Sequence, residues 1–394
     1  MLFACSLLFL SFGSLVPVQG TQTLDDVVDI FGDKLHIMRP GYGGDRPVEV
    51  KVSMHINDVV MDGFKPVLTL TMYVRQYWQD DRLSFQNNDS MPGRPISLSG
   101  EDIGLIWTPD LFFSNLVDGF VQDIFKDNVM IRISPNGRVL SSQRVSVDVR
   151  CPLNMRYFPA DTQVCRFNME SYSLTANDIA LLWMDGEPIS VDDDVSIPQF
   201  SLSTVNVSTS QQMFTTGSYM KLAASITFLR HMGGHVTMFQ IPSILLVISS
   251  WISFWIPVRL AHARILIGIL LLLGHVALST MARALLLSNV AYMTLLDIWM
   301  AIDTTLIFFA LLESVAVVFF HRSHDQMSSD DGVARPDGGA ETIPMTDFVK
   351  PEHAATGRKL GGMSGRMDLI SRIVFPVLYF LINIIYWPYL SSVQ

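Results

Sequence analysis

Two cysteines supply the most informative chemistry in this chain of 394 residues. Cys151 and Cys165 are separated by thirteen residues, and the third cysteine, Cys5, lies in an apolar N-terminal segment. Once that segment is discounted, the two remaining thiols are expected to form a disulfide, which implies an oxidising compartment. Closing a loop of this size stabilises a fold by about 3 kcal/mol in the chain-entropy model. A bridge of this kind is also typical of an ordinary secreted domain, so the rest of the chain must decide the class.

The N-terminus predicts secretion. Residues 1–20 contain an apolar core at residues 7–10 and end in small residues, so we expect a cleaved signal peptide there. Between residues 21 and 234 no apolar run is long enough to cross a bilayer. We therefore expect this part of the chain to fold as a soluble domain.

Four apolar segments in the C-terminal half are each close to the length of a membrane span. They cover residues 239–258, 265–287, 296–320 and 369–390. Basic residues lie between the first two segments and along the polar linker before the last, which favours a cytoplasmic position for both connections. We therefore predict an extracellular domain at 21–235, three membrane helices at 236–320, a cytoplasmic loop at 321–368 and a fourth membrane helix at 369–391.

The predicted extracellular domain has the pattern of β-strands. Residues 48–56 and 68–75 alternate apolar and polar side chains, and a turn at residues 135–137 separates two further strand-like segments. This pattern predicts an all-β sandwich followed by a four-helix transmembrane bundle. Asn88 and Asn206 begin glycosylation sequons, which favour exposed positions. The formal charge of −10 suits a soluble acidic domain, and no nucleic-acid partner is expected.

Several motifs in one order resemble a known family. The segment between the cysteines contains Phe158-Pro159-x-Asp161, and the other motifs are Tyr73–Trp78, Trp107–Asn115, Ser250–Trp255 and Asp297–Met300. Together these motifs resemble the Cys-loop pentameric ligand-gated ion channels, especially the glycine and GABA receptors of the anion branch. The resemblance runs from about residue 45 to the last apolar segment. It implies a homo- or hetero-pentamer in the plasma membrane, with the N-terminus extracellular and with like or related subunits, membrane lipid, chloride and a small-molecule agonist as partners.

The resemblance implies a ligand site between subunits, with one half on each of two neighbouring faces. On the complementary face it assigns Tyr73, Arg75 and Ser142. Tyr73 and Arg75 share one side of their strand, since successive residues of a strand alternate. A guanidinium beside a hydroxyl suits a carboxylate, because arginine presents a planar fork of donors.

On the principal face the resemblance assigns five residues. Tyr172, Phe214 and Tyr219 are the aromatic candidates, with Glu170 and Thr216 as polar partners. An ammonium over an aromatic ring is stabilised by about 0.5–2 kcal/mol. The two faces together suit an amino-acid-like zwitterion.

One departure leaves a different stimulus open. Glycine- and glutamate-gated relatives carry a second disulfide near the closing loop, and this chain has no cysteines to form it, whereas the GABA-receptor branch also lacks it. The same absence, with His55, His231 and His235, allows gating by protons or a metal ion. No tight cluster of histidine and cysteine ligands is visible in the sequence, so no metal site is assigned.

The second apolar segment resembles the family's pore-lining helix. Cation-conducting members place a glutamate just before a conserved basic residue at the cytoplasmic mouth, whereas this chain has Ala263 before Arg264 and His262 before both. We therefore expect an anion pore, with Arg264 supplying positive charge and five copies of Leu273 forming a hydrophobic constriction. The assigned pore residues are His262, Ala263, Arg264, Leu266, Leu270, Leu273 and Ala277.

The pore stripe also favours an alternative. Leu266, Leu270 and Leu273 are apolar over two helical turns, about 10 Å of pore, although relatives usually have a hydroxyl residue at the position of Leu270. A non-conducting accessory subunit that needs partner subunits is therefore the second hypothesis. For coupling between domains, the resemblance assigns Phe158, Pro159, Asp161 and Arg230.

An enzyme is the hypothesis from another class. It would use Glu170 and Asp161 as paired carboxylates, but nothing in the sequence places them in one cleft. The sequence offers no defensible Ser/His/Asp arrangement and no phosphate-binding loop, so we expect neither catalysis nor a cofactor.

Overall fold

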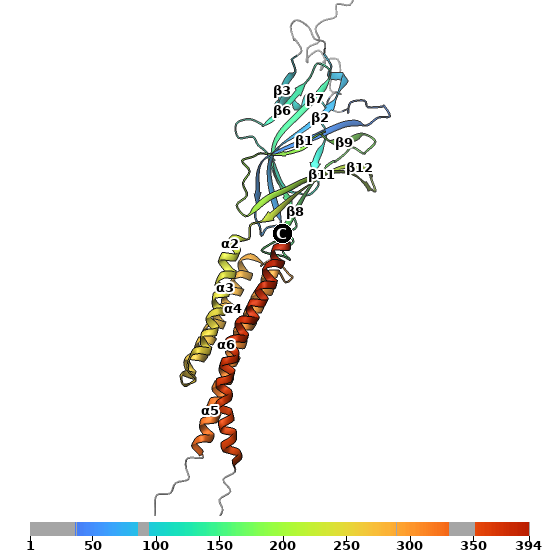
Figure 1. Cartoon of the computed structure of the whole chain (residues 1–394). Coiled ribbons are helices and arrows are strands. Elements are labelled where there is room, and N and C mark those ends of the chain that lie inside the picture. Colours follow the sequence, from blue (N-terminus) through green and yellow to red (C-terminus); the bar gives the residue numbers. More distant parts are fainter. Residues whose placement is uncertain (1–35, 37, 86–93, 289, 331–350, 394) are drawn as a thin grey trace, which may run out of the picture.

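The computed structural model describes residues 36, 38–85, 94–288, 290–330 and 351–393. Within these ranges the chain forms a β-domain and a bundle of long helices, which Figure 1 shows one above the other. This agrees with the predicted β-sandwich followed by four membrane helices. The predicted signal peptide at 1–20 and the sequon at Asn88 lie outside the described residues, whereas Asn206 is exposed on a strand of the β-domain.

The first sheet of the β-domain has eight strands. Six of them follow the order β10-β1-β2-β7-β6-β3, while β5 pairs with β7 and β9 pairs with β1. The bounds are β1 Val48–Met61, β2 Val67–Gln79, β3 Ile96–Ser99, β5 Leu116–Val121, β6 Val129–Ile133, β7 Arg138–Arg150, β9 Ile179–Trp183 and β10 Ile189–Val191.

The second sheet has four strands in the order β11-β12-β8-β4. Inward residues of both sheets, such as Val50, Met54, Phe167 and Ile226, form one buried core. The alternation of apolar and polar residues therefore gives each sheet one buried face, as predicted from the sequence. The bounds are β4 Leu111–Phe113, β8 Thr162–Ser171, β11 Phe200–Phe214 and β12 Gly217–Arg230.

The turn predicted at residues 135–137 joins β6 to β7. Gly137 has a φ of +77°, which residues with a side chain rarely adopt. A Cβ at this position would lie 2.5 Å from the carbonyl oxygen of Asp80. Glycine is therefore required both by the backbone conformation and by the close approach.

Four helical segments are long and apolar enough to cross a membrane: Gly233–Trp255, Val258–Leu286, Leu295–Ser323 and Gly365–Ser392. The first contains α2 (Gly233–His235), a π-helical turn (Val236–Gln240), α3 (Ile241–Ser250) and a 3₁₀ turn (Trp251–Trp255). The next three belong to α4 (Ala261–Leu286), α5 (Leu295–Asp330) and α6 (Pro351–Val393).

The helix boundaries differ from the sequence prediction mainly at the polar linker. Residues 321–330 continue α5 and residues 351–368 begin α6, although the sequence predicted a loop from 321 to 368. The 36 residues of α5 span about 54 Å, which is much more than the roughly 30 Å of a bilayer core. Hydropathy therefore locates the part of the helix within the bilayer and misses the part that continues beyond it.

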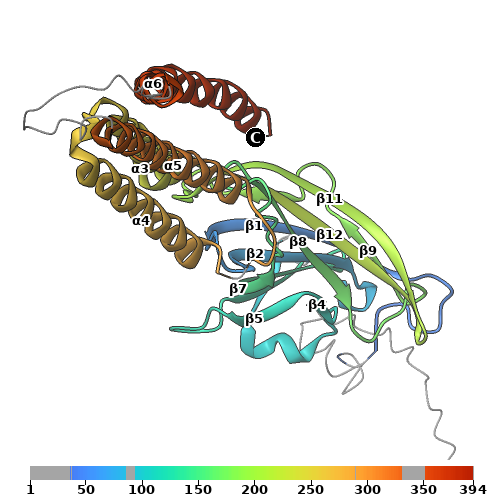
Figure 2. The ribbon, with the colours of Figure 1, turned by 90° about the horizontal axis from the view of Figure 1, so that it is seen from below.

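The helices form a bundle in which α3 and α5 lie between α4 and α6, as seen from below in Figure 2. A buried polar network joins three of them. His275 on α4 lies 2.9 Å from the hydroxyl of Ser243 on α3 and 3.0 Å from the hydroxyl of Thr304 on α5. Ser243 also donates a hydrogen bond to Asp303. Polar groups inside a bilayer need such internal partners, because the surrounding lipid supplies none.

Cys151 and Cys165 form a disulfide between the end of β7 and β8, and both side chains belong to the buried core. The loop that they close carries Phe158, which is fully buried among residues of the helical domain. The bridge thus stabilises a segment that contacts both domains.

We predict that Cys151→Ser or Cys165→Ser greatly reduces delivery of the chain to the cell surface, because the loop loses its covalent closure. Surface biotinylation of both single variants measures this. Mass spectrometry that finds both residues as free thiols in surface-delivered wild-type protein would contradict the prediction.

Candidate functional site

The complementary half of the predicted site lies on β2 and β7. In the antiparallel register of these strands, Arg75 is directly opposite Ser142, and Tyr73 is directly opposite Arg144. Residues directly opposite each other share one face of a sheet. The structure therefore brings Tyr73, Arg75 and Ser142 together, as the sequence resemblance implies.

Two guanidinium groups lie near the ring of Tyr73. The Cζ atoms of Arg75 and Arg144 are each 5.9 Å from the ring centroid. Among the described residues neither side chain forms an ion pair or a hydrogen bond, and Nε of Arg144 is buried without a partner. Such cationic donors can pair with an anionic group, because a carboxylate offers both the opposite charge and hydrogen-bond acceptors.

His55 on β1 completes this face. Its ring stacks on Tyr73 with the centroids 6.3 Å apart, and its Nδ1 is 2.9 Å from the hydroxyl of Ser190 on β10. The strand register therefore places His55 directly opposite Tyr73, as a packing and hydrogen-bonding residue.

The principal half lies on the second sheet. Glu170 of β8 is paired in register with Phe112 of β4 and with Lys221 of β12. Its side chain is 9% exposed, and one carboxylate oxygen lies 3.5 Å from Nζ of Lys221. Lys221 therefore offsets part of the negative charge that the sequence assigned to this half of the site.

Aromatic side chains on this sheet form two separate pairs. The rings of Phe112 and Tyr172 meet edge to face with centroids 5.7 Å apart, and those of Phe214 and Tyr219 do so at 5.9 Å. Tyr172 is exposed, and Thr216 is exposed at the tip of the β11–β12 hairpin. Within the described chain, no ring contact joins the two pairs.

The two halves belong to different sheets of one subunit. In Figure 1 the hairpin of β11 and β12 projects at one edge of the β-domain, whereas β3 and β6 lie toward the other. Phe214 and Tyr219 are on that hairpin, while Ser142 is on β7, the strand that pairs with β6, and Arg75 is on β2, the next strand beyond β7. A closed site therefore needs the principal face of one subunit and the complementary face of another.

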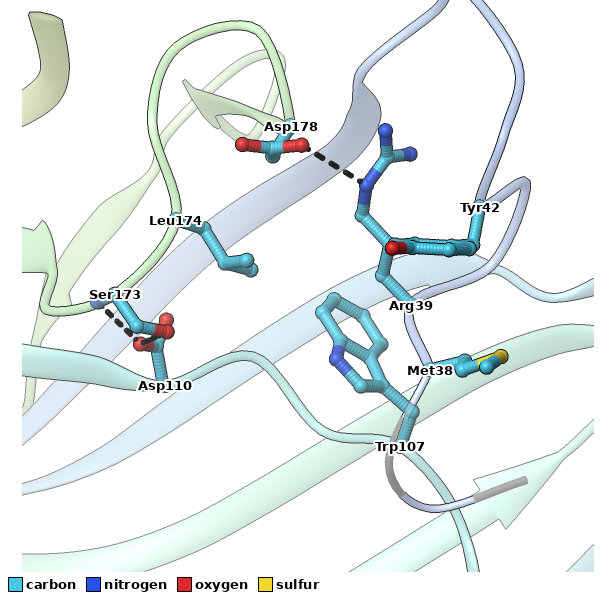
Figure 3. A pocket seen from close by; sticks show the side chains of 8 residues that line it. All are labelled: Met38, Arg39, Tyr42, Trp107, Asp110, Ser173, Leu174 and Asp178. Carbon is cyan, nitrogen blue, oxygen red and sulfur yellow. Dashed lines mark hydrogen bonds and ion pairs between the residues drawn. The ribbon is translucent and has the colours of Figure 1, made fainter. Parts of the chain in front are cut away.

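A cavity of about 340 Å³ lies beside the principal half, next to the segment that carries Tyr172. Figure 3 shows Trp107 between Arg39 and Asp110, with Arg39 reaching Asp178 and Asp110 facing Ser173. Arg39 lies 3.3 Å from Asp178, and the carboxylate of Asp110 accepts hydrogen bonds from the hydroxyls of Ser171 and Ser173 at 2.5 and 2.6 Å. The hydrogen bonds of Asp110 hold the segment that carries Tyr172.

The predicted coupling residues meet at the base of the β-domain. The guanidinium of Arg230 donates from Nε and Nη2 to the two carboxylate oxygens of Asp161, at 2.7 and 3.0 Å. Both side chains are essentially fully buried. The Cζ atom of Arg230 also lies 5.1 Å from the ring centroid of Phe158. Pro159 follows Phe158 in the same loop, so the four assigned residues form one contiguous group.

The loop between the cysteines is hydrogen-bonded to the start of α5. The backbone N–H groups of Leu295 and Leu296 donate to the carbonyls of Arg156 and Phe158, at 3.0 and 3.1 Å. The backbone N–H of Met155 donates to the phenol oxygen of Tyr292 at 2.8 Å. The linker from α4 to α5 is thus tied directly to the β-domain.

The structure corrects one prediction at the pore helix. Arg264 was expected to supply positive charge at the cytoplasmic mouth, but its side chain is fully buried. Its Nη1 and Nη2 donate to the two carboxylate oxygens of Asp368 on α6, at 3.1 and 2.7 Å. This charge is neutralised inside the bundle and is absent from the exposed face of α4. The assignment was wrong in that respect because the partner lies 104 positions along the chain.

The apolar pore stripe lies on the opposite side of α4. At 100° per residue, Leu266, Leu270, Leu273 and Ala277 lie about 180–240° around the helix from Arg264. The three leucines are each 57–60% exposed in the single chain, and Ala277 is exposed as well. His262 is exposed and Ala263 half-buried near the start of the helix. Which of these side chains face the pore of an assembled channel stays a prediction.

The residues that would gate the channel by protons or a metal ion lie apart from one another, and so do those of the enzyme hypothesis. Within the ranges that the structure describes, no group of three or more His, Cys, Asp or Glu side chains could hold a metal ion. His235 packs against Phe158 at the membrane end of the β-domain, whereas His55 is on the ligand face. Asp161 directly precedes β8 and Glu170 lies near the other end of this strand, about 30 Å away at strand spacing, so they do not form a catalytic pair.

Three residues contact the candidate site or the domain junction but were given no role from the sequence. Phe112 was inside the motif Trp107–Asn115 but was not assigned a role. Arg144 was on the polar face of the same strand as Ser142, two residues away, and the alternation of the strand could have identified it. Tyr292 lies in the linker between α4 and α5, where no sequence pattern indicates a contact with Met155.

Comparison with known families agrees with this architecture. Residues 27–232 match the neurotransmitter-gated ion-channel ligand-binding domain, and residues 239–359 match the neurotransmitter-gated ion-channel transmembrane region. The first match covers the β-domain, and the second covers the first three membrane helices and continues into the linker.

Full-length relatives show the same membership. The chain is 30% identical to the γ-aminobutyric acid receptor subunit rho-1 of Mus musculus over 90% of this chain and 82% of that protein, and 31% identical to the Homo sapiens subunit over the same shares. It is 30% identical to the glutamate-gated chloride channel of Drosophila melanogaster over 88% of this chain and 85% of that protein. The chain therefore belongs to the neurotransmitter-gated ion-channel family, the Cys-loop receptors, and is a multi-pass membrane protein of a family of channels rather than of enzymes.

Proposed function

We propose that the chain is a subunit of a pentameric chloride channel that opens when a small amino acid binds between neighbouring subunits. The observation that carries this proposal is the pair of guanidiniums of Arg75 and Arg144, each 5.9 Å from the ring centroid of Tyr73 and neither in an ion pair among the described residues. A cationic face without its own counter-charge is costly to keep partly buried, so it favours an anionic ligand.

The ligand has a carboxylate and an ammonium. The carboxylate pairs with Arg75 and accepts from the hydroxyl of Ser142, which lies directly opposite in the strand register. The ammonium lies on the facing subunit among Tyr172, Phe214 and Tyr219, with Glu170 as the nearest acidic side chain. A cation over an aromatic ring contributes about 0.5–2 kcal/mol, depending on desolvation.

γ-Aminobutyric acid is the first candidate ligand, because the related rho-1 subunits are named as its receptors. The glutamate-gated relative makes glutamate the second. Glutamate would bring a second carboxylate into a site whose principal half contains Glu170, only partly offset by Lys221 at 3.5 Å. Like charges at short range disfavour binding, so the charge balance favours a ligand with one carboxylate.

Chloride selectivity follows from the mouth of the pore and from the relatives. Ala263 stands where cation-conducting members have a glutamate, so no ring of carboxylates forms there. Since Arg264 is paired with Asp368, the exposed basic side chains at this end of the span are Arg259, in the turn just before α4, and His262. Selectivity would thus rest on the missing carboxylate more than on Arg264.

Opening requires a path from the site to α4. Ligand closure of the β11–β12 hairpin would pull on β12, whose last residue is Arg230. Arg230 holds Asp161, and the loop of Asp161 is bonded to Leu296 and Tyr292. These contacts form a continuous chain of covalent and hydrogen bonds from the ligand hairpin to the linker after α4.

The proposed topology places residues 1–20 as a removed signal peptide and 21–235 outside the cell. The three helices at 236–320 and the helix at 369–391 cross the plasma membrane, with the 321–368 connection in the cytoplasm. Asn206, exposed on β11, is then available for glycosylation.

A non-conducting accessory subunit is the second candidate function. The observation that favours it is the stripe of Leu266, Leu270 and Leu273, each more than half exposed on α4. Three rings of leucine in a pentamer would expel water over about two helical turns. Such a chain would need partner subunits with hydroxyl residues in the pore.

A ligand screen on cells that express the chain, alone and with related subunits, tests the proposal. γ-Aminobutyric acid, glutamate, glycine, protons and zinc are applied, and the reversal potential is measured under chloride substitution. Current with γ-aminobutyric acid that follows the chloride potential supports the proposal. Current only with protons or zinc, or a reversal potential that follows sodium, would refute it, and current only in mixed assemblies would indicate the accessory role.

Arg75→Ala and Phe214→Ala are each expected to raise the agonist concentration for half-maximal response at least tenfold. Each variant removes one of the two groups that hold the ligand, and tenfold corresponds to about 1.4 kcal/mol. Concentration–response curves measure the shift. The matched variants Arg138→Ala and Phe125→Ala change exposed residues outside the site and should leave the curve unchanged. Unshifted curves for both site variants would mean that the ligand binds elsewhere.

Tyr292→Phe is expected to reduce the maximal current while ligand affinity stays within about twofold. The variant removes only the oxygen that accepts from the backbone N–H of Met155, so a buried donor loses its partner at a cost of about 1–3 kcal/mol. Radioligand binding and current are measured on the same cells. Tyr389→Phe, on the exposed surface of α6, is the control. Equal currents in the two variants would show that this hydrogen bond does not contribute to coupling between the domains.

Leu270→Thr is expected to increase current from assemblies of this chain alone, because a ring of hydroxyls keeps water where leucine expels it. The same substitution at Leu285, which is 60% exposed near the other end of α4, serves as a control for general effects of a hydroxyl on this helix. Whole-cell current normalised to surface protein is the measurement. No gain at Leu270, or an equal gain at both positions, would show that the leucine stripe does not limit conduction.

A further inference from the structure

His275 on α4 is held by side chains from two other helices. Its Nδ1 lies 3.0 Å from the hydroxyl of Thr304 on α5, and its Nε2 lies 2.9 Å from the hydroxyl of Ser243 on α3. Ser243 is also hydrogen-bonded to Oδ2 of Asp303 on α5, and this oxygen is 4.0 Å from Nε2 of His275. The side chains of His275 and Asp303 are both fully buried. These four residues, the His275 network, therefore connect three helices within their membrane segments.

The protons of the His275 network can be counted, because each hydroxyl has only one hydrogen. The hydroxyl of Thr304 donates its hydrogen to the carbonyl of Met300 at 2.7 Å. It therefore accepts from His275, so Nδ1 carries a proton. When the hydroxyl of Ser243 donates to an ionised Asp303, it has no hydrogen left for Nε2, which must then carry a proton as well. In this arrangement His275 is an imidazolium and Asp303 is its counter-ion.

A second arrangement contains the same number of protons. A neutral Asp303 donates to Ser243, and Ser243 donates to the unprotonated Nε2 of a neutral His275. In both arrangements the charges of the network add to zero. With one proton fewer, Nε2 of His275 and Oδ2 of Asp303 both face the single hydrogen of Ser243, and the network has a net negative charge. Inside a bilayer the lost hydrogen bond and the buried charge are both costly.

Within the part of the chain that the structure describes, no third charged side chain forms an ion pair with His275 or Asp303. The other polar side chains around the pair are uncharged, and they are Gln240 on α3, Thr304 on α5, and Tyr379 and Tyr386 on α6. Arg264 and Arg283 on α4 lie about 16 and 12 Å from His275 along the helix, and each is already paired with an aspartate. A proton lost from the pair would thus not be compensated by a neighbour.

We propose that His275 and Asp303 share one proton, and that this proton keeps α4 anchored to α3 and α5. Asp303 is then a positioning residue for α4, on which it acts through Ser243 and His275. His275 is two residues from Leu273, so the network anchors the helix close to the proposed constriction. α4 is the pore helix only under the proposed function, whereas its anchoring by this network does not depend on that function.

The shared proton makes the anchoring depend on pH. When α4 moves away and the two side chains are hydrated, histidine has its ordinary pKa of about 6.5 and aspartate its ordinary pKa of about 3.9. Above about pH 6.5 the separated pair therefore holds no proton, whereas the anchored pair holds one. The arrangement that binds more protons loses stability as the pH rises. Anchoring is thus complete near pH 6.5 and weakens progressively at alkaline pH.

A thiol on the buried side of α4 measures this anchoring without agonist or current, so its failure is separate from failure of the proposed channel function. Ala282 is 2% exposed and lies two turns beyond His275 on the same side of the helix. Because Cys151 and Cys165 form a disulfide, Ala282→Cys adds a free thiol that can be followed. Its rate of reaction with a water-soluble iodoacetamide is measured on full-length protein in unsealed cell membranes, at about pH 6.5 and about pH 9.

Asp303→Asn, combined with Ala282→Cys, is the reference for this measurement. The amide donates to Ser243 as a neutral acid would, but it has no proton to lose, so the rate changes with pH only through the thiol itself. We expect the rate with Asp303 divided by the rate with Asp303→Asn to be close to one at about pH 6.5. At about pH 9 this ratio should be at least fivefold higher, because only the protein with Asp303 loses its anchoring.

Two serine variants on α3 sharpen the test. Ser243→Ala interrupts the network, so the thiol should react at least fivefold faster than in the parent protein at about pH 6.5. Ser249→Ala, which changes a half-buried serine on the same helix, should leave the rate unchanged. A ratio close to one at both pH values would overturn the proposal, and so would a rate in Ser243→Ala that equals the parent rate. Either comparison decides alone if the other variant fails to reach the membrane.

Discussion

The buried ion pair of Asp161 and Arg230 is the interaction on which the two domains depend. Both charges are removed from water, and rings of Phe64, Phe158 and Phe200 lie 4.5–5.3 Å from the guanidinium carbon. Removing one partner of such a pair typically costs 3–5 kcal/mol, because the other charge stays buried without compensation. Arg230 ends β12, three residues before the first membrane helix begins, and Asp161 lies in the loop that contacts α5. The pair therefore fixes the ligand-bearing strand, the disulfide loop and the membrane domain relative to one another.

At this junction the carboxylate of Asp161 balances the charge of Arg230, whereas the two arginines of the proposed ligand site have no such carboxylate. Arg75 and Arg144 have no anionic partner among the described residues, although their strands are otherwise well packed. Aromatic side chains gather on the other sheet, where a positive group can be held by rings and by Glu170. In the proposed site, each subunit would present one incomplete half on each of two faces, and a neighbouring subunit would supply the other half. The proposed chemistry then requires an oligomer, in agreement with the family.

Local patterns predicted most of the fold. Alternation in β1 and β2, the turn at Gly137 and the four apolar segments depend on neighbouring residues, and each appears in the structure within a few positions. Strand alternation put Tyr73 and Arg75 on one side, and the family motifs put Ser142 with them, but the register that sets Arg75 opposite Ser142 comes from the structure. Contacts between distant positions could not be predicted in this way. Arg264 meets Asp368 and Tyr292 meets Met155 across 104 and 137 positions, and no periodicity encodes such a contact. Arg264 was consequently expected to supply charge at the pore mouth, whereas its side chain is buried.

The apolar face of α4 results from the burial of its polar residues inside the helical bundle. Arg264, Gly268, His275 and Ala282 are buried and lie within about 40° of one another around the helix. Inside a bilayer, Arg264 and His275 need the partners that α3, α5 and α6 supply, so the polar side of α4 has to face the bundle. Gly268 allows the close approach, because a Cβ there would lie 2.7 Å from Leu311 of α5. What remains for the opposite side is largely leucine, with Thr280 as a hydroxyl residue near the outer end. The apolar stripe is therefore a consequence of how this helix is anchored, and any gain in pore polarity has to come from substitutions on that outward face or from a partner subunit.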